Sequence, residues 1–464
     1  EAREIHMDST LDERQKYALI VNLYLLEEKF ELTIYVRKFL DKLGKDSDGE
    51  IDRTIFAFIA MGEYFSNIKI PVAYIARYMD SSGKLNPKSV EKKYDSFNGL
   101  FLKNKMQGTE AIGYGIKHYL IALEMLDQIL GKGQKDVWRG GLPDLVLKFI
   151  DFLCQMFRGM DKIDDVIKNI VTWLFTDKTK SRWHNGNEDV YESSFTSLLM
   201  ELGEYRRIEI IDHLADKLGS FIEDKIPHNE SRMEYKLLAH VYAQRARIRS
   251  KSQRLDDTEE SQDNELLEYM HETMEVISAE NICEYDLEHI LGMCYLERAK
   301  KLKEKEEWTQ EFYQKFLDNI DDAIERFNYA IWYGSPDYGV PCKIDAITTA
   351  VTAIIKYKKI DLDKNTNKLN EDDELRKYVD DGIKVIQDID EYFLSTKAKT
   401  IAEKRKDEFE QACFPNETSE FLQRLNQLES KLSDDDYEGH YMVSTMTVYA
   451  YEKKHYSEEY RRSS

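Results

Sequence analysis

The chain has 464 residues, with 88 acidic and 66 basic side chains and a formal net charge of −22. A surface this acidic repels phosphate backbones and anionic lipids, so we expect no nucleic-acid partner and no membrane surface as a partner. No apolar run approaches the about 20 residues of a membrane-spanning helix. The five cysteines lack the spacing of a disulfide framework or zinc site, which favours a cytoplasmic location.

The composition predicts an all-α protein with more than one core. Charged residues make up 33% of the chain, and there are only 7 Pro and 21 Gly. We expect a helical lead-in at 1–45, a winged-helix domain at 46–133, a helical connector at 134–230 and a repeat domain at 231–464. The chain starts with EAREIHM, not with Met. We expect these seven residues to be an expression remnant and the chain to be a fragment of a longer protein.

The region 46–133 has the most distinctive order of predicted elements. Apolar spacing predicts three helices and, after a hairpin, a fourth, over 51–64, 70–79, 86–98 and 119–130. The hairpin is predicted from two short runs, LFLKNKM and AIGYGIK, that flank a turn containing Gly108. This is the order of a winged helix, with the hairpin as the wing. The third helix mixes lysines with carboxylates, which does not favour DNA binding.

The connector is predicted to contain helices over 138–157, 164–175, 191–204 and 208–226. Within it, Arg206, Arg207 and His213 have the Arg-then-His spacing of a HEPN-type ribonuclease helix. Arg206 and His213 lie within about 20° of one helix face, where they could grip a phosphate and polarise a ribose hydroxyl. The alternative is an amphipathic helix with surface arginines and a partly buried histidine.

A basic segment, Arg245 to Arg254, follows in the repeat domain. It is a candidate for a local basic patch. The alternative, which we favour on composition, is a solvated helix end beside an acidic loop.

Repeat signals run through the last region. Leu238-Ala239 and Leu291-Gly292 share a Leu-small-x-x-Tyr pattern, and Ala323, Phe327 and Ala330 follow at helical spacing. These are marks of a tetratricopeptide repeat, in which a small residue lets two helices approach and an aromatic ring fills the gap. Ala239 and Gly292 lie 53 residues apart, against about 34 in the standard repeat, and Gly292 and Ala323 lie 31 apart, where the standard repeat leaves about 12. These spacings predict an irregular TPR-like α-solenoid with longer helices or inserts. Further helices are predicted over 338–358, 373–393 and 419–432, with a short β element after Asp434.

One side of two solenoid helices is predicted to face a concave, partner-binding groove. The expected groove residues are Lys236, His240, Gln244, Arg247, His289, Met293, Glu297 and Lys300. The alternative is that they are ordinary exposed helix residues. The sequence contains no phosphate-binding loop, dinucleotide fingerprint or zinc-protease motif, and its ten histidines are scattered, so we expect no catalytic or metal site in this chain.

A winged helix whose wing ends in a histidine and an apolar helix, followed by helical repeats, resembles the C-terminal part of STAND ATPases. The antiviral STAND sensors of bacteria share a His-x-x-Ile-Ala stretch, matched here by His118, Ile121 and Ala122. In the family the matching histidine contacts the β-phosphate of bound ADP, so the resemblance implies a nucleotide-sensing role for His118. It also implies that ATP or ADP and Mg²⁺ bind a nucleotide domain N-terminal to this chain.

The resemblance further implies how the protein works. The repeat array would bind a target protein, typically a phage structural protein such as the large terminase subunit or the portal. Binding would drive oligomerisation and activate an N-terminal effector. The alternatives are a TPR-type scaffold that binds host proteins and a HEPN-like ribonuclease.

Overall fold

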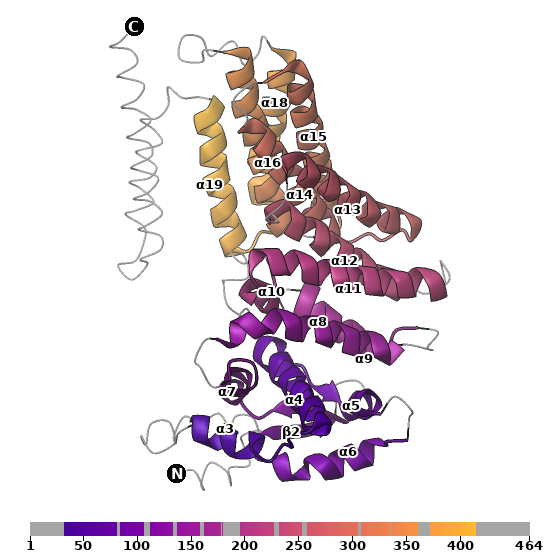
Figure 1. The fold of residues 1–464 in the computed structure, drawn as a ribbon. Helices are drawn as coiled ribbons and strands as arrows, with labels where there is room; N and C mark the ends of the chain where they lie inside the picture. The colour runs from indigo at the N-terminus through magenta and orange to yellow at the C-terminus, as the bar shows by residue number, and fades with distance from the viewer. Residues whose placement is uncertain are drawn as a thin grey trace, which may run out of the picture. The chain divides into compact units, whose positions relative to one another are not determined.

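A computed structural model describes residues 32–80, 84–105, 112–132, 137–157, 162–177, 179, 195–226, 232–252, 258–304, 308–334, 336–360 and 372–413. These residues are predominantly α-helical, as the composition predicts, and include a three-stranded sheet (Figure 1). The chain divides into two compact units, unit 1 at residues 1–282 and unit 2 at 283–464. Within the described ranges, no helix is both long and apolar enough to cross a membrane. The predicted hairpin turn, the helix over 419–432 and the tail after Asp434 lie outside these ranges.

Unit 1 begins with helices around a small antiparallel sheet. The elements are α3 (Leu32–Leu40), α4 (Ser47–Ser66), β1 (Ile70–Pro71), α5 (Val72–Met79), α6 (Pro87–Tyr94), a 3₁₀ turn (Asp95–Phe97), β2 (Phe101–Lys105), β3 (Ile112–Ile116) and α7 (Tyr119–Ile129). Strands β2 and β3 pair antiparallel, with Phe101 opposite Ile116 and Lys105 opposite Ile112, as predicted for hairpin arms. The sequence pattern does not predict β1, which pairs with the other edge of β3.

Local signals set the ends of these helices. The Asp46 side chain caps α4 by accepting a hydrogen bond from the Gly49 N–H at 3.0 Å. The same helix ends at Asn67, whose φ of 56° is left-handed. Asn86 caps α6 through the Ser89 N–H at 3.0 Å, with Pro87 in the first turn, where a missing N–H costs nothing.

Aromatic rings join α4 to the strand region. The Phe56 ring packs edge-on against Tyr94, Phe97 and Phe101, with centroid distances of 5.2, 4.9 and 4.6 Å. All four side chains are buried. The Tyr94 hydroxyl donates to Asp52 Oδ1 at 2.8 Å, which satisfies the polar end of a ring inside the core. These ring contacts pack Phe101, the first residue of β2, against α4, and β3 pairs with β2.

The rest of unit 1 is helical. It consists of α8 (Trp138–Phe157), α9 (Asp165–Val171), a π-helical turn (Thr172–Thr176), α10 (Ser197–Glu201), α11 (Glu204–Lys225), α12 (Arg232–Lys251) and α13 (Glu259–Ala279). The predicted continuous helix over 191–204 is wrong in its described part, because α10 ends at Glu201. Arg207 supplies the reason: its Nε and Nη2 donate to the carbonyls of Leu199 at 2.8 Å and Leu202 at 3.0 Å. These bonds satisfy carbonyls that a continued helix would otherwise pair.

Arg245, Arg247 and Arg249 of α12 are buried and not part of a solvated helix end, which corrects the interpretation of the segment from Arg245. Arg245 and Arg249 are 5% and 1% exposed. The Arg245 guanidinium lies 4.7 Å from the Tyr242 ring centroid and 4.1 Å from that of Tyr269. It also pairs with Glu272. A weakly hydrated guanidinium stacks well between rings, so this segment joins α12 to α13 instead of presenting charge to a partner.

Unit 2 contains α14 (Tyr285–Lys303), α15 (Gln310–Trp332), α16 (Pro336–Lys358), α18 (Asp373–Gln387), a 3₁₀ turn (Asp388–Glu391) and α19 (Thr396–Cys413). Helix α16 packs against α14, α15, α18 and α19. The predicted helix over 373–393 is shorter than expected: α18 tightens into the 3₁₀ turn after Gln387. Helices approach closely at two glycines, of which Gly292 was predicted to allow such an approach. A Cβ on Gly292 would lie 2.6 Å from Cε1 of Phe327, and one on Gly382 would overlap the ring of Phe409.

Candidate functional site

Helix α14 carries four of the predicted groove residues. His289, Met293, Glu297 and Lys300 follow one another at helical spacing and are all half-buried. The His289 ring packs against Tyr338 and Phe327, with centroids 5.3 and 6.0 Å away, so this end of the row is covered by α15 and α16. Lys300, at the other end, reaches α16, where its Nζ lies 2.9 Å from Asp345 Oδ2. Both ends of this row therefore contact α16, and the His289 end also contacts α15.

Four cations of α14, α16 and α19 form a connected group at one end of unit 2, two of them paired with Asp345. Arg405 of α19 brings its Nη2 to within 3.4 Å of the same Asp345 Oδ2 that Lys300 contacts. One turn further along α14, the Lys303 Nζ donates to the hydroxyl of Thr352 at 2.6 Å. Lys356 follows Thr352 by one turn of α16 and acts electrostatically on Lys303. We name Lys300, Lys303, Lys356 and Arg405 the basic cluster.

Electrostatics distinguish Lys303 from an ordinary surface lysine. Burial lowers its pKa below the usual value, Lys300 and Lys356 lower it further, and Asp345 acts in the opposite direction. The two carboxylates that face the cluster, Asp345 and Glu408, pair with Lys300 and Arg405. The balance is an excess of positive charge on one face of a strongly acidic chain.

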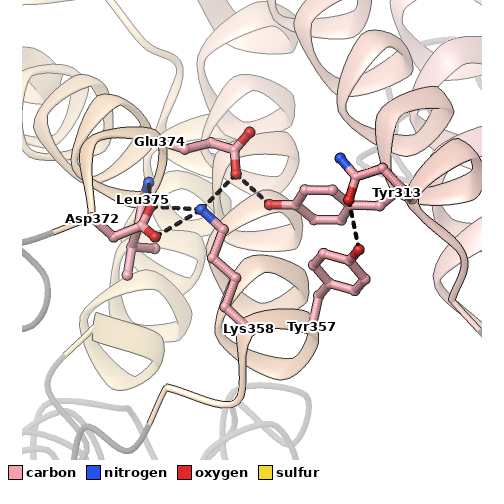
Figure 2. Close-up of polar contacts among 7 residues, drawn as sticks. Tyr313, Tyr357, Lys358, Asp372, Glu374 and Leu375 are labelled. Atoms are coloured by element: carbon pink, nitrogen blue, oxygen red, sulfur yellow. Dashed lines mark hydrogen bonds and ion pairs between the residues drawn. The ribbon is translucent and has the colours of Figure 1, made fainter.

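Lys358, in the last turn of α16, forms a second group of polar contacts, shown in Figure 2. Lys356 and Lys358 are two residues apart, which places them about 200° apart around the helix. The Lys358 Nζ lies 2.7 Å from Asp372 Oδ2 and 2.9 Å from Glu374 Oε2, and Glu374 also accepts a hydrogen bond from the Tyr313 hydroxyl. We name Tyr313, Lys358, Asp372 and Glu374 the Lys358 clamp.

The clamp is a structural device that joins three helices. Asp372 caps α18 by accepting from the Leu375 N–H at 2.9 Å. Burial opposes the charged form of Lys358, but hydrogen bonds to Asp372 and Glu374 outweigh it and raise its pKa. Burial would raise the pKa of Asp372, yet the bonds from Lys358 and the Leu375 amide lower it. The Lys358 ammonium is thus paired within this site, unlike Lys303 and Lys356 of the basic cluster.

The other four predicted groove residues lie on α12, in unit 1. Lys236 and His240 are half-buried, whereas Gln244 and Arg247 are 6% and 9% exposed. The Gln244 Nε2 donates to the Thr176 carbonyl at 3.1 Å, and the Arg247 guanidinium lies 6.0 Å from the Phe195 ring centroid. Both side chains are therefore engaged inside unit 1. The eight predicted residues are divided between the two compact units.

His118 sits at the junction of β3 and α7. It is the N-cap of α7, and its Nδ1 accepts from the Leu120 N–H at 3.2 Å. Its ring packs beside Tyr119, with centroids 4.6 Å apart. Because Nδ1 is the acceptor, the neutral ring carries its proton on Nε2.

The Arg206 and His213 side chains lie on the same face of α11, as the spacing predicts. Both contact α8: Arg206 pairs with Asp144, and the His213 Nε2 lies 3.0 Å from Asp151 Oδ1. Arg207 turns away to the carbonyls of Leu199 and Leu202. These contacts give Arg206 and His213 a role in holding α8 against α11.

Among the described residues, no three His, Cys, Asp or Glu side chains are grouped so that they could hold a metal ion. No known protein family matches the chain, and no curated protein matches its sequence. The sequence reasoning found Lys300 but missed Lys303, Lys356 and Arg405. The run KKLK at 300–303 carries a signal for Lys303, whereas nothing local indicates that α19 brings Arg405 to the same carboxylate.

Proposed function

We propose that this chain binds a target protein through the helical array of unit 2, as the ligand-sensing region of a STAND-type NTPase. The observation that carries the proposal is the face formed by α14, α16 and α19. It presents four cations in a chain whose formal charge is −22. Asp345 and Glu408 pair with two of them, and among the described residues no carboxylate lies within ion-pair distance of the other two, Lys303 and Lys356.

Two features of unit 2 support a TPR-like array. Its helices are long, and α16 contacts the helices on both sides of it, as a repeat in the middle of a solenoid does. Glycine meets a phenylalanine ring at Gly292 and again at Gly382, which repeats the small-residue and aromatic device of helical repeats. Exposed rings add apolar contact area for a partner, since Trp332 is 80% and Phe393 98% exposed.

The order of elements from α4 to α7 supports a winged-helix domain at 46–133. Helices, the paired strands β2 and β3, and a final helix follow one another in the sequence expected for that domain. His118 stands where the resemblance puts the phosphate-contacting histidine. Its Nε2–H is a suitable donor to a phosphate oxygen, because Nδ1 is held by the Leu120 amide. ADP or ATP with Mg²⁺ would be supplied by a nucleotide domain preceding this region.

We infer that the target is a foreign protein, with phage structural proteins as the first class to test. Purified large terminase subunits and portal proteins would each be mixed with the chain and separated by size-exclusion chromatography with light scattering. Co-elution of one of them in a fixed ratio is the expected result. If no phage protein co-elutes while cytoplasmic host proteins do, the chain is a scaffold of the TPR type instead.

A further inference from the structure

We propose that the basic cluster binds an acidic segment of the partner protein, with carboxylates of that segment pairing with Lys303 and Lys356. This inference rests on the proposed function, since it names the chemistry by which the α14, α16 and α19 face recognises its ligand. The partner is identified here only by a short run of Asp or Glu side chains.

Two of the four cations in the basic cluster form no ion pair with a described residue. Lys300 and Arg405 share one oxygen of Asp345, at 2.9 and 3.4 Å. Among the residues that the structure describes, neither Lys303 nor Lys356 has a carboxylate within ion-pair distance, although acidic side chains outnumber basic ones by 88 to 66 in the chain. The polar partner of Lys303 is the neutral hydroxyl of Thr352. Carboxylates of a bound partner protein would supply ion pairs for Lys303 and Lys356.

Helix dipoles account for only part of this arrangement. Lys303 and Lys356 lie in the last turns of α14 and α16, where a positive charge is favourable. A lysine placed there only for the dipole would extend into water. Lys303 is instead half-buried. Burial outweighs the favourable charge of Asp345, and Lys300 and Lys356 add repulsion, so the charged form of Lys303 is disfavoured at that position. A bound anion would relieve this cost, which makes a ligand the better explanation.

The charge of the whole chain selects among anions. A nucleic acid is a long polyanion, and its phosphates beyond the cluster would be repelled by the net negative charge of the chain. A short acidic peptide places its charges within the cluster alone. The side chains of Lys300 and Arg405 are 35% and 34% exposed, so the cluster is open to such a segment without rearrangement of the helices.

The test uses the whole chain and a labelled hexaglutamate peptide, with hexaglutamine as the neutral control, followed by fluorescence anisotropy at low salt. We expect hexaglutamate to bind, and the double variant Lys303→Gln, Lys356→Gln to bind it about tenfold more weakly. The matched control is Lys377→Gln, which removes an exposed lysine of α18 that is paired with Asp321 at 2.7 Å. It should change the affinity less than about twofold. Lys356→Gln alone, at an exposed position, keeps the test valid if the double variant fails to fold.

Equal binding of hexaglutamate by the wild type and the Lys356→Gln and double variants would overturn the inference, as would the absence of binding. Preference for a single-stranded oligonucleotide over hexaglutamate would overturn it too. Its failure is separable from failure of the proposed function. A target protein that co-elutes equally with wild type and double variant would leave the proposed function intact and reject the acidic-segment inference. Hexaglutamate binding with no phage target would do the reverse.

Discussion

Replacing Gly292 by alanine tests the packing on which the helical array depends. A Cβ at this position would lie 2.6 Å from Cε1 and 2.8 Å from Cδ1 of Phe327, whose side chain is fully buried. Inserting a methyl group into such a contact costs about 1–3 kcal/mol. Alanine also gains about 1 kcal/mol over glycine inside a helix. The balance is a loss of about 0–2 kcal/mol in the free energy of unfolding.

The chain offers a matched control for this substitution. A Cβ on Gly140, near the start of α8, would meet nothing within 4 Å. Gly140→Ala should therefore stabilise the protein by about 0.5–1 kcal/mol, so the two variants should differ by about 0.5–3 kcal/mol in urea denaturation. Adding Phe327→Leu to Gly292→Ala should recover part of the loss in a double-mutant cycle. If Gly292→Ala is as stabilising as Gly140→Ala, α14 and α15 do not approach each other as described.

Three further predictions concern other contacts. Asp372→Asn keeps the cap of α18 but removes its charge beside Lys358, and should cost about 0.5–1 kcal/mol at pH 7. Because the pKa of Asp372 is lowered in the folded state, its contribution is present above its unfolded pKa of about 3.9 and is lost as the pH falls through the folded value. In urea denaturation the difference between the two proteins should shrink as the pH falls below about 3.9, and a difference that stays constant would refute the ion pair. His118→Ala should lower the free energy of unfolding by about 1 kcal/mol by removing the α7 cap, whereas His118→Asn should lose only a few tenths; equal losses would argue against capping. The wild-type protein should cleave single-stranded RNA no faster than the double variant Arg206→Ala, His213→Ala. A clearly faster cleavage by the wild type would restore the ribonuclease hypothesis.

Local periodicity predicted much of the fold. The helix over 138–157 is observed with the bounds that its apolar spacing indicates, and the two arms of the hairpin pair as expected. The features that were missed depend on contacts distant in sequence. Strand β1 is two residues long and exists because β3 offers it an edge. The break before α11 depends on Arg207, whose guanidinium takes the carbonyls of the preceding helix.

The candidate site was predictable only in part for the same reason. Spacing along α14 selected Lys300, because one helix face can be identified from the sequence. The carboxylate that Lys300 contacts lies on α16, and Arg405 reaches it from α19, so the cluster forms only when three helices pack. One predicted groove residue proved to be buried. Arg247, predicted to face a partner, is 9% exposed and packs in unit 1.

We propose that unit 2 captures a foreign protein. Its most direct test is a pull-down in which the immobilised chain is exposed to lysates of phage-infected and uninfected bacteria, with bound proteins identified by mass spectrometry. We expect one phage structural protein, held stoichiometrically and present only in the infected sample. The same host proteins in equal amounts from both lysates would contradict it and indicate a scaffold.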